Sequence, residues 1–160
     1  RKRVAEQKRL IAAYNKEEKG WPIDIVEGDY EPERFYEMAR GMEEEKEGGE
    51  RCFKCYRLRL EETAKAAKAG GFSYFTTTLS ISPHKNAQVL NELGKEISDV
   101  FGVPYLYSDF KKKNGYKRSC ELSEIYGLYR QNYCGCIYSK LEADEREKAK
   151  NNNEQPLSVQ

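Results

Sequence analysis

Four of the five cysteines in this 160-residue sequence stand in two close pairs. Cys52 and Cys55 lie in "RCFKCY", and Cys134 and Cys136 lie in "NYCGCI". In a cytosolic chain of this size, paired cysteines are more often metal ligands or redox groups than structural crosslinks. The spacing therefore favours metal binding or electron transfer as the role of these cysteines.

Cys52 and Cys55 are three positions apart at the start of a predicted helix, where side chains with this spacing share one face. Two thiolates placed in this way can bind one metal ion or adjacent irons of a cluster. Positive charge that favours thiolates comes from the amino end of the helix and from Arg51, Lys54, Arg57 and Arg59. The alternative is that both cysteines are ordinary small residues on a helix face.

Cys134 and Cys136 flank Gly135 and are close enough in sequence to form a disulfide. So small a ring departs from relaxed disulfide geometry, and glycine is the residue that best accepts the required backbone dihedrals. Strain raises the reduction potential, which suits a couple that cycles between dithiol and disulfide. A four-thiolate zinc site built from both pairs is the competing interpretation. Cys120 stands alone in "RSCELS" and is interpreted as a small buried residue.

A basic stretch, "FKKKNGYKRS", occupies residues 110–119. Its charges could contact phosphates, and its tyrosine could stack on an exposed base. The candidate nucleic-acid contacts are Lys111, Lys112, Lys113, Tyr116, Lys117 and Arg118. The alternative is a solvated surface loop.

The overall charge balance is close to zero, with 28 Lys and Arg residues against 27 Asp and Glu residues. Such a balance argues neither for nor against a polyanionic partner, so only local clustering of charge is informative. No apolar run approaches the roughly 18 residues of a membrane span, and no signal peptide opens the sequence. We expect a cytoplasmic protein with no membrane partner.

Helical periodicity alternates along the chain with short runs of β-forming residues. Helices are predicted at residues 1–15, 32–42, 50–69, 86–101 and 121–126, and strands at 23–26, 72–79 and 103–110. Strands separated by helices favour an α/β fold, with a parallel sheet and flanking helices of Rossmann-like or HUP-like type and an additional C-terminal helical segment. We expect one α/β domain over residues 1–145 and a disordered tail over residues 146–160.

Several unusual segments occur in an order that resembles one known family. They are "IVEGDYEPERF", "GGERCFKCYRLRLEETAKAAKAGGFSYFTTTLSISPHKN", the loop before "RSCELS", and "GLYRQNYCGCIYS". Taken together, they resemble the cobalamin-independent epoxyqueuosine reductases, the QueH family, from about residue 1 to residue 139.

The resemblance implies an enzyme that reduces epoxyqueuosine to queuosine at the wobble position of tRNA, the last step of queuosine biosynthesis. It implies that Cys52 and Cys55 are two ligands of a 4Fe-4S cluster and that Cys134 and Cys136 are the redox-active disulfide. An additional iron beside the cluster and an electron donor of unassigned identity are implied as well. Converting an epoxide to an alkene and water consumes two electrons and two protons, and a dithiol stores two electrons.

Members of the family also begin with a strand and a Cys-Cys motif that supply the other two cluster ligands. Residues 1–160 contain no match to that motif, so we expect an N-terminal strand and helix to be missing. Two rival interpretations remain. One is a structural zinc-binding module, and the other is a relative of the ATP pyrophosphatases of tRNA thiolation, which would need a phosphate-binding glycine-rich loop.

Overall fold

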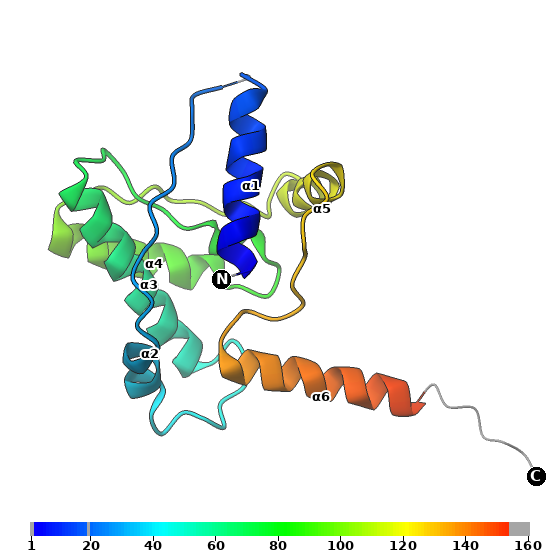
Figure 1. Cartoon of the computed structure of the whole chain (residues 1–160). Helices are drawn as coiled ribbons and strands as arrows, with labels where there is room; N and C mark the ends of the chain where they lie inside the picture. The colour runs from blue at the N-terminus through cyan, green and yellow to red at the C-terminus, as the bar shows by residue number, and fades with distance from the viewer. Residues whose placement is uncertain (1, 19, 154–160) are drawn as a thin grey trace, which may run out of the picture. The chain divides into compact units, whose positions relative to one another are not determined.

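The computed structural model describes residues 2–18 and 20–153, which form two compact units that divide after Tyr129. The first unit contains α1 (Lys2–Lys16), α2 (Pro32–Ala39), α3 (Glu50–Ala69), the 3₁₀ helix η1 (Thr78–Ile81), α4 (Ala87–Phe101) and α5 (Gly115–Ile125). The second contains α6 (Ile137–Asn153). Figure 1 shows the course of the chain through these elements.

The centre of the first unit is the contact between α3 and α4, with α2 packed against α3 (Figure 1). Both long helices present an apolar stripe at helical spacing. The core residues that meet there are Leu60, Ala64, Ala67, Phe75, Ile97, Val103 and Tyr105. Removing this apolar surface from water is the main force that fixes α3 on α4.

Helix α4 is delimited by residues at its two ends. Asn86 precedes the first turn, and its Oδ1 accepts the N–H groups of Gln88 at 3.0 Å and Val89 at 3.2 Å. This N-cap satisfies two of the backbone donors that the first turn of a helix leaves without a partner. Gly102 ends the helix, and its N–H donates to the carbonyl of Ser98 at 2.9 Å.

The predicted α/β fold is wrong for the part of the chain that the structure describes, because it contains helices and no β-strand. The segments predicted as the second and third strands meet only in one isolated parallel bridge, between Phe75 and Tyr105. Phe75 N–H donates to Pro104 O at 3.0 Å, and Leu106 N–H donates to Phe75 O at 2.8 Å. A parallel ladder needs a longer run of paired residues, and Thr78 already begins η1.

The first predicted strand, residues 23–26, has no regular secondary structure and pairs with no other segment among the described residues. Its backbone is instead held by a side chain of α1. Ile23 N–H donates to Asn15 Oδ1 at 3.0 Å, and Asn15 Nδ2 donates to Ile23 O at 2.9 Å. Because its first residue bonds in this way, the segment follows α1 rather than a sheet.

The predicted boundary at residue 145 falls within α6, so residues 146–153 of the predicted tail are helical. Residues 154–160 of that tail lie outside the described residues, as does Arg1 of the first predicted helix. None of the described helices combines the length and apolar character needed to cross a lipid bilayer.

Candidate functional site

The first cysteine pair lies in the first turns of α3. Cys52 and Cys55 are buried, with 8% and 9% of their surfaces exposed, and the helix begins directly after Gly49. The three-residue spacing on a helix places both side chains on the same face. All five cysteines of the chain are thiols rather than disulfides in this structure.

Both sulfur atoms accept hydrogen bonds from N–H groups. Gly48 N–H donates to Cys52 Sγ at 3.2 Å, and the Arg59 guanidinium donates from Nε to Cys55 Sγ at 3.3 Å. Hydrogen bonds to cysteine sulfur stabilise the negative charge that the sulfur carries as a metal ligand. The two sulfurs therefore have hydrogen-bond donors of the kind that a thiolate ligand accepts.

The loop before α3, residues 43–49, is held against the helix by the buried side chain of Arg51. Nη1 of Arg51 donates to the carbonyls of Met42 and Glu43, both at 2.9 Å. The backbone N–H of Arg51 donates to Glu45 Oε2 at 2.9 Å. These bonds fix the backbone that carries Gly48 towards the sulfur of Cys52.

An ion pair with the turn before α4 also holds the loop of residues 43–49 in place. Lys85 Nζ lies 2.6 Å from Glu47 Oε1, and the two side chains are only 5% and 18% exposed. The ammonium group also lies 5.9 Å from the ring centroid of Tyr56, within the range of a cation–π contact. Glu47 is the residue directly before Gly48, so this ion pair positions the donor to Cys52.

An apolar contact supports the pair from α4. Cys52 packs with Tyr56 and the fully buried Leu90, and Phe53, Leu79, Val89 and Leu93 surround this cluster. The cysteine therefore lies at the border between a packed core and the polar loop of residues 43–49. A site of this kind excludes water on one side and offers hydrogen-bond donors on the other.

Cys52 and Cys55 could provide two ligands of a metal centre, but two side chains do not make a complete site. Thiolates bind soft and borderline metals, among them zinc and the irons of iron–sulfur clusters. Within residues 2–18 and 20–153, no group of three or more His, Cys, Asp or Glu side chains is arranged to hold a metal ion.

The second cysteine pair lies in the second unit, directly before α6. Gly135 between the two cysteines has φ +117°, a backbone region that favours glycine. Its N–H donates to Ser139 Oγ at 3.2 Å, and Ser139 N–H donates to Cys136 Sγ at 3.3 Å. Cys136 thus accepts a first-turn N–H of α6, and both cysteines are half-buried. Cys134 and Cys136 are not joined by a disulfide in this structure.

The basic stretch is a turn followed by the first half of α5. Lys113 and Asn114 have φ values of +51° and +63°, and α5 begins at Gly115, earlier than the helix predicted at residues 121–126. Lys112, Lys113, Tyr116, Lys117 and Arg118 are exposed, whereas Lys111 is half-buried. The structure gathers these candidate residues on one turn and one helix.

Asp109 organises the lysines of this turn. Its Oδ1 lies 2.7 Å from Lys111 Nζ, and its Oδ2 lies 3.7 Å from Lys112 Nζ. The hydrogen bond from Lys111 lowers the pKa of the Asp109 carboxyl below its usual range. Lys111 Nζ also lies 3.5 Å from the carbonyl of Lys85. The basic turn is therefore linked through Lys111 and Lys85 to the loop beside Cys52.

Sequence reasoning did not identify Lys85 or the role of Asp109. Lys85 lies 38 positions from Glu47, and no local pattern in the sequence joins the two residues. Arg59 was identified from the sequence as a positive charge near the pair, and the structure adds its hydrogen bond to Cys55, four positions earlier on α3. Cys120 is half-buried on α5, where the sequence predicted a buried small residue.

Comparison with known proteins gives a consistent result. Residues 1–142 match the model of the family described as epoxyqueuosine reductase QueH. The chain is 49% identical over 120 residues to epoxyqueuosine reductase QueH of Streptococcus pyogenes serotype M1, covering 75% of this chain and 47% of that protein. The corresponding protein of Staphylococcus epidermidis is 42% identical over 142 residues, covering 88% and 59%.

The QueH protein of Thermotoga maritima is 34% identical over 146 residues, which cover 89% of this chain and 76% of that protein. The chain spans about half the length of the first two relatives, at 47% and 59%. The family model covers most of the chain, including both cysteine pairs and the basic turn. The chain belongs to the epoxyqueuosine reductase QueH family.

Proposed function

We propose that the protein is an epoxyqueuosine reductase that converts epoxyqueuosine to queuosine at the wobble position of tRNA. Membership of the QueH family is the observation that carries this proposal. The buried pair of Cys52 and Cys55, with an N–H donor on each sulfur, supports it from the structure. A redox function also agrees with a second, half-buried dithiol at Cys134 and Cys136.

In this proposal, Cys52 and Cys55 are two thiolate ligands of a 4Fe-4S cluster. A cluster of this type supplies electron transfer, usually of one electron at a time. Gly48 and Arg59 would hold negative charge on the two sulfurs, and Leu90 and Tyr56 would keep water from one side of Cys52. We assign no residue to the remaining ligands or to an additional iron.

The electron balance of the reaction supports a redox role for the second pair, Cys134 and Cys136. Reducing the epoxide breaks two carbon–oxygen bonds, forms a carbon–carbon double bond and releases water, which takes two electrons and two protons. Oxidising the dithiol of Cys134 and Cys136 to a disulfide releases two electrons and two protons. One dithiol therefore matches one turnover, after which an external donor of two electrons must regenerate the thiols.

Substrate binding is proposed for the basic turn and the start of α5. Lys112, Lys113, Lys117 and Arg118 would contact phosphates of the anticodon loop, and the exposed ring of Tyr116 would stack on a base. The contact of Lys111 with the Lys85 carbonyl supports this assignment, because it joins the turn to the neighbourhood of Cys52. A modified base must leave the stack of the loop to be reduced.

The assignment of the cysteines is tested by three variants of the full-length protein, purified without oxygen. We expect Cys52→Ser to lose bound iron and turnover, and Cys134→Ser to keep the iron and lose turnover. Cys120→Ser is the matched control and should keep both. Iron and sulfide are measured chemically, and queuosine is measured by nucleoside analysis of tRNA. Loss of iron in Cys134→Ser, or its retention in Cys52→Ser, would reverse the assignments.

The substrate assignment is tested by RNA binding at several salt concentrations. Lys112→Ala combined with Lys113→Ala should weaken binding of an anticodon stem-loop and reduce the slope of log K against log salt by about 1.4, at roughly 0.7 per single-strand phosphate contact. Lys65→Ala combined with Lys68→Ala, two exposed lysines of α3, is the control. An unchanged slope in the first double variant would remove the turn from the binding surface.

A further inference from the structure

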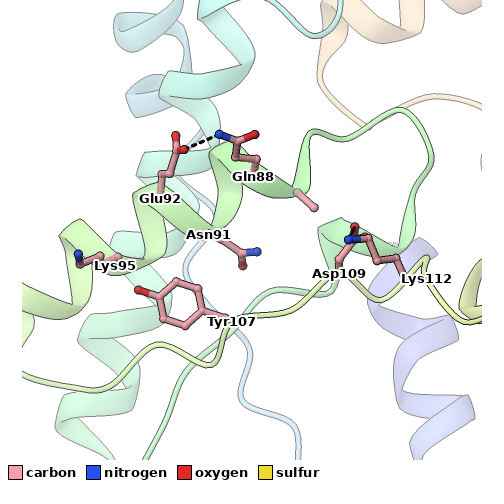
Figure 2. Close-up of a pocket in the computed structure, with 8 residues that line it drawn as sticks. Gln88, Asn91, Glu92, Lys95, Tyr107, Asp109 and Lys112 are labelled. Carbon is pink, nitrogen blue, oxygen red and sulfur yellow. Dashed lines mark hydrogen bonds and ion pairs between the residues drawn. The ribbon is translucent and has the colours of Figure 1, made fainter.

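An open pocket of about 380 Å³ lies between α4 and the segment of residues 107–112 (Figure 2). Helix α4 contributes Gln88, Asn91 and Glu92, and the facing segment contributes Tyr107 and Asp109. The cysteine pairs do not line the pocket, so it is separate from the metal-binding residues proposed above. It mixes an aromatic ring with amide, carboxylate and lysine groups.

The ring of Tyr107 is a fixed and accessible aromatic surface. It is 58% exposed, and it meets Tyr105 edge-on at 5.6 Å between centroids and an interplanar angle of 76°. Tyr105 is in turn held edge-on by Phe75 at 5.2 Å. The contact with Tyr105 holds the ring of Tyr107 in place. The exposed part of the Tyr107 ring can therefore stack on a flat ligand with little loss of side-chain conformational entropy.

Hydrogen bonds fix the polar groups of the pocket. Asn91 Oδ1 accepts the N–H of Ser108 at 3.1 Å, so its Nδ2 remains a donor towards the pocket. Gln88 Nε2 donates to Glu92 Oε1 at 2.9 Å, which orients the amide oxygen and the carboxylate (Figure 2). Oriented donors and acceptors beside an aromatic ring are the groups that recognise the edge of a nucleobase.

The charges at the pocket indicate what kind of nucleotide it can take. Lys95 and Lys112 contribute two positive charges to its lining, and Glu92 and Asp109 contribute two negative charges. A site with no net charge does not favour the several negative charges of a free nucleoside polyphosphate. It suits the neutral base of an RNA nucleotide, with a lysine near its single phosphodiester charge.

Helix geometry places this pocket and Cys52 on opposite sides of α4. At 100° per residue, Gln88, Asn91 and Lys95 share one face, whereas Leu90, which packs on Cys52, points away from it. A helix with its side chains is about 10 Å across. A base in the pocket therefore lies a helix thickness from Cys52, too far to be the base that is reduced there.

From these observations we infer that the pocket holds an unstacked base of the anticodon loop other than the modified one. This inference rests on the proposed function, because it takes tRNA as the substrate. Binding the base of this neighbouring nucleotide would fix the register of the anticodon loop on the protein. The modified base would then be presented towards Cys52 and Cys55. Tyr107 stacks on the captured base, and Asn91 and Glu92 contact its edge.

The test uses anticodon stem-loops with 2-aminopurine at one loop position at a time and the full-length protein. With the wild type, we expect the fluorescence of one position other than the wobble position to change on binding. Tyr107→Ala should abolish this change and weaken binding about tenfold, the size expected for the loss of one stacked base. Tyr107→Phe, which keeps the ring, should retain both.

Tyr74→Ala is the matched control, since Tyr74 is similarly exposed at 62% and does not line the pocket. If the wild type binds the RNA but Tyr107→Ala binds equally well with the same fluorescence, the pocket assignment is overturned while the proposed function stands. If the signal that depends on Tyr107 comes from the wobble position, the assignment to a neighbour is overturned. If the wild type binds no RNA, the inference and the proposed tRNA substrate both fail.

Discussion

The ion pair of Lys85 and Glu47 offers a quantitative test of how the loop beside Cys52 is held. Lys85 is 5% exposed and Glu47 is 18% exposed, with 2.6 Å between Nζ and Oε1. Removing one partner of a fully buried pair costs about 3–5 kcal/mol, because a charge is left without compensation. Since Glu47 keeps some contact with water, we expect Lys85→Met to lower the free energy of unfolding by about 2–3 kcal/mol.

For a chain of this size, the expected loss in the free energy of unfolding corresponds to a fall in Tm of about 4–12 °C. Urea unfolding measures the free energy, and thermal unfolding measures Tm. Glu47→Gln in the Lys85→Met background should recover much of the loss, because the buried charge is then removed. Arg57→Met is the control, since Arg57 pairs with Glu96 at the surface and such pairs contribute at most about 1 kcal/mol.

The same variant should affect Cys52, because Glu47 directly precedes the residue that donates to its sulfur. We expect alkylation of Cys52 to be faster in Lys85→Met than in the wild type, by up to the roughly 30- to 150-fold that 2–3 kcal/mol represents, as the loop opens more often. Mass spectrometry of the labelled peptide measures the rate. If Lys85→Met is as stable as Arg57→Met and Cys52 reacts at the wild-type rate, the ion pair does not position this loop.

Three further predictions concern packing and titration in the first unit. Gly94→Ala should destabilise the protein by about 1–2 kcal/mol in urea unfolding, because the added Cβ would lie 2.5–2.6 Å from ring atoms of Tyr105. This overpacking outweighs a gain of about 1 kcal/mol in helix propensity. An increase in stability would contradict the close packing. Burial raises the pKa of the Tyr105 hydroxyl above 10.0, so the stability that this group contributes is complete below pH 10.0 and falls as the pH rises through the folded-state pKa. Absorbance at 295 nm follows the titration of the tyrosine. Tyr105→Phe should remove this part of the pH dependence of stability. The hydrogen bond from Lys111 lowers the pKa of the Asp109 carboxyl below 3.8, so the stability that this group contributes is present above pH 3.8 and is lost as the pH falls below that value. Carboxyl NMR should show that Asp109 becomes protonated only below pH 3.8. A pKa of 3.8 or higher would refute the contact.

The helices of the first unit were largely predictable because their signals are local. The prediction of a helix at residues 50–69 matches α3, and the one at residues 86–101 differs from α4 only by its cap, Asn86. Apolar spacing and the capping residue are both contained in a short window of sequence. Those signals do not depend on what the helix later contacts.

The strands could not be predicted in the same way, because a strand exists only through pairing with a distant segment. The β-forming residues of 72–79 and 103–110 indicate extended backbone, yet the described residues pair them only at Phe75 and Tyr105. Residues 23–26 form no strand either, and Asn15 takes the hydrogen bonds of Ile23. Composition predicts extended conformation better than it predicts a partner.

The candidate site shows the same division. The spacing of Cys52 and Cys55 identified the pair from sequence, and the structure adds that both are buried at the start of α3. The long-range partners, above all Lys85 with Glu47, are set by tertiary packing and have no local pattern. The pocket at Tyr107 also joins residues from α4 and a separate segment, so no single motif reveals it.

The central claim is that Cys52 and Cys55 hold part of an iron–sulfur cluster used to reduce epoxyqueuosine in tRNA. The most direct measurement is iron, sulfide and zinc analysis, with electron paramagnetic resonance, of the full-length protein purified without oxygen, for the wild type and for Cys52→Ser. We predict about four irons and four sulfides per chain in the wild type, with a signal that appears on reduction by dithionite. We predict that Cys52→Ser loses them. One zinc and no iron in a protein that still forms queuosine would contradict the account.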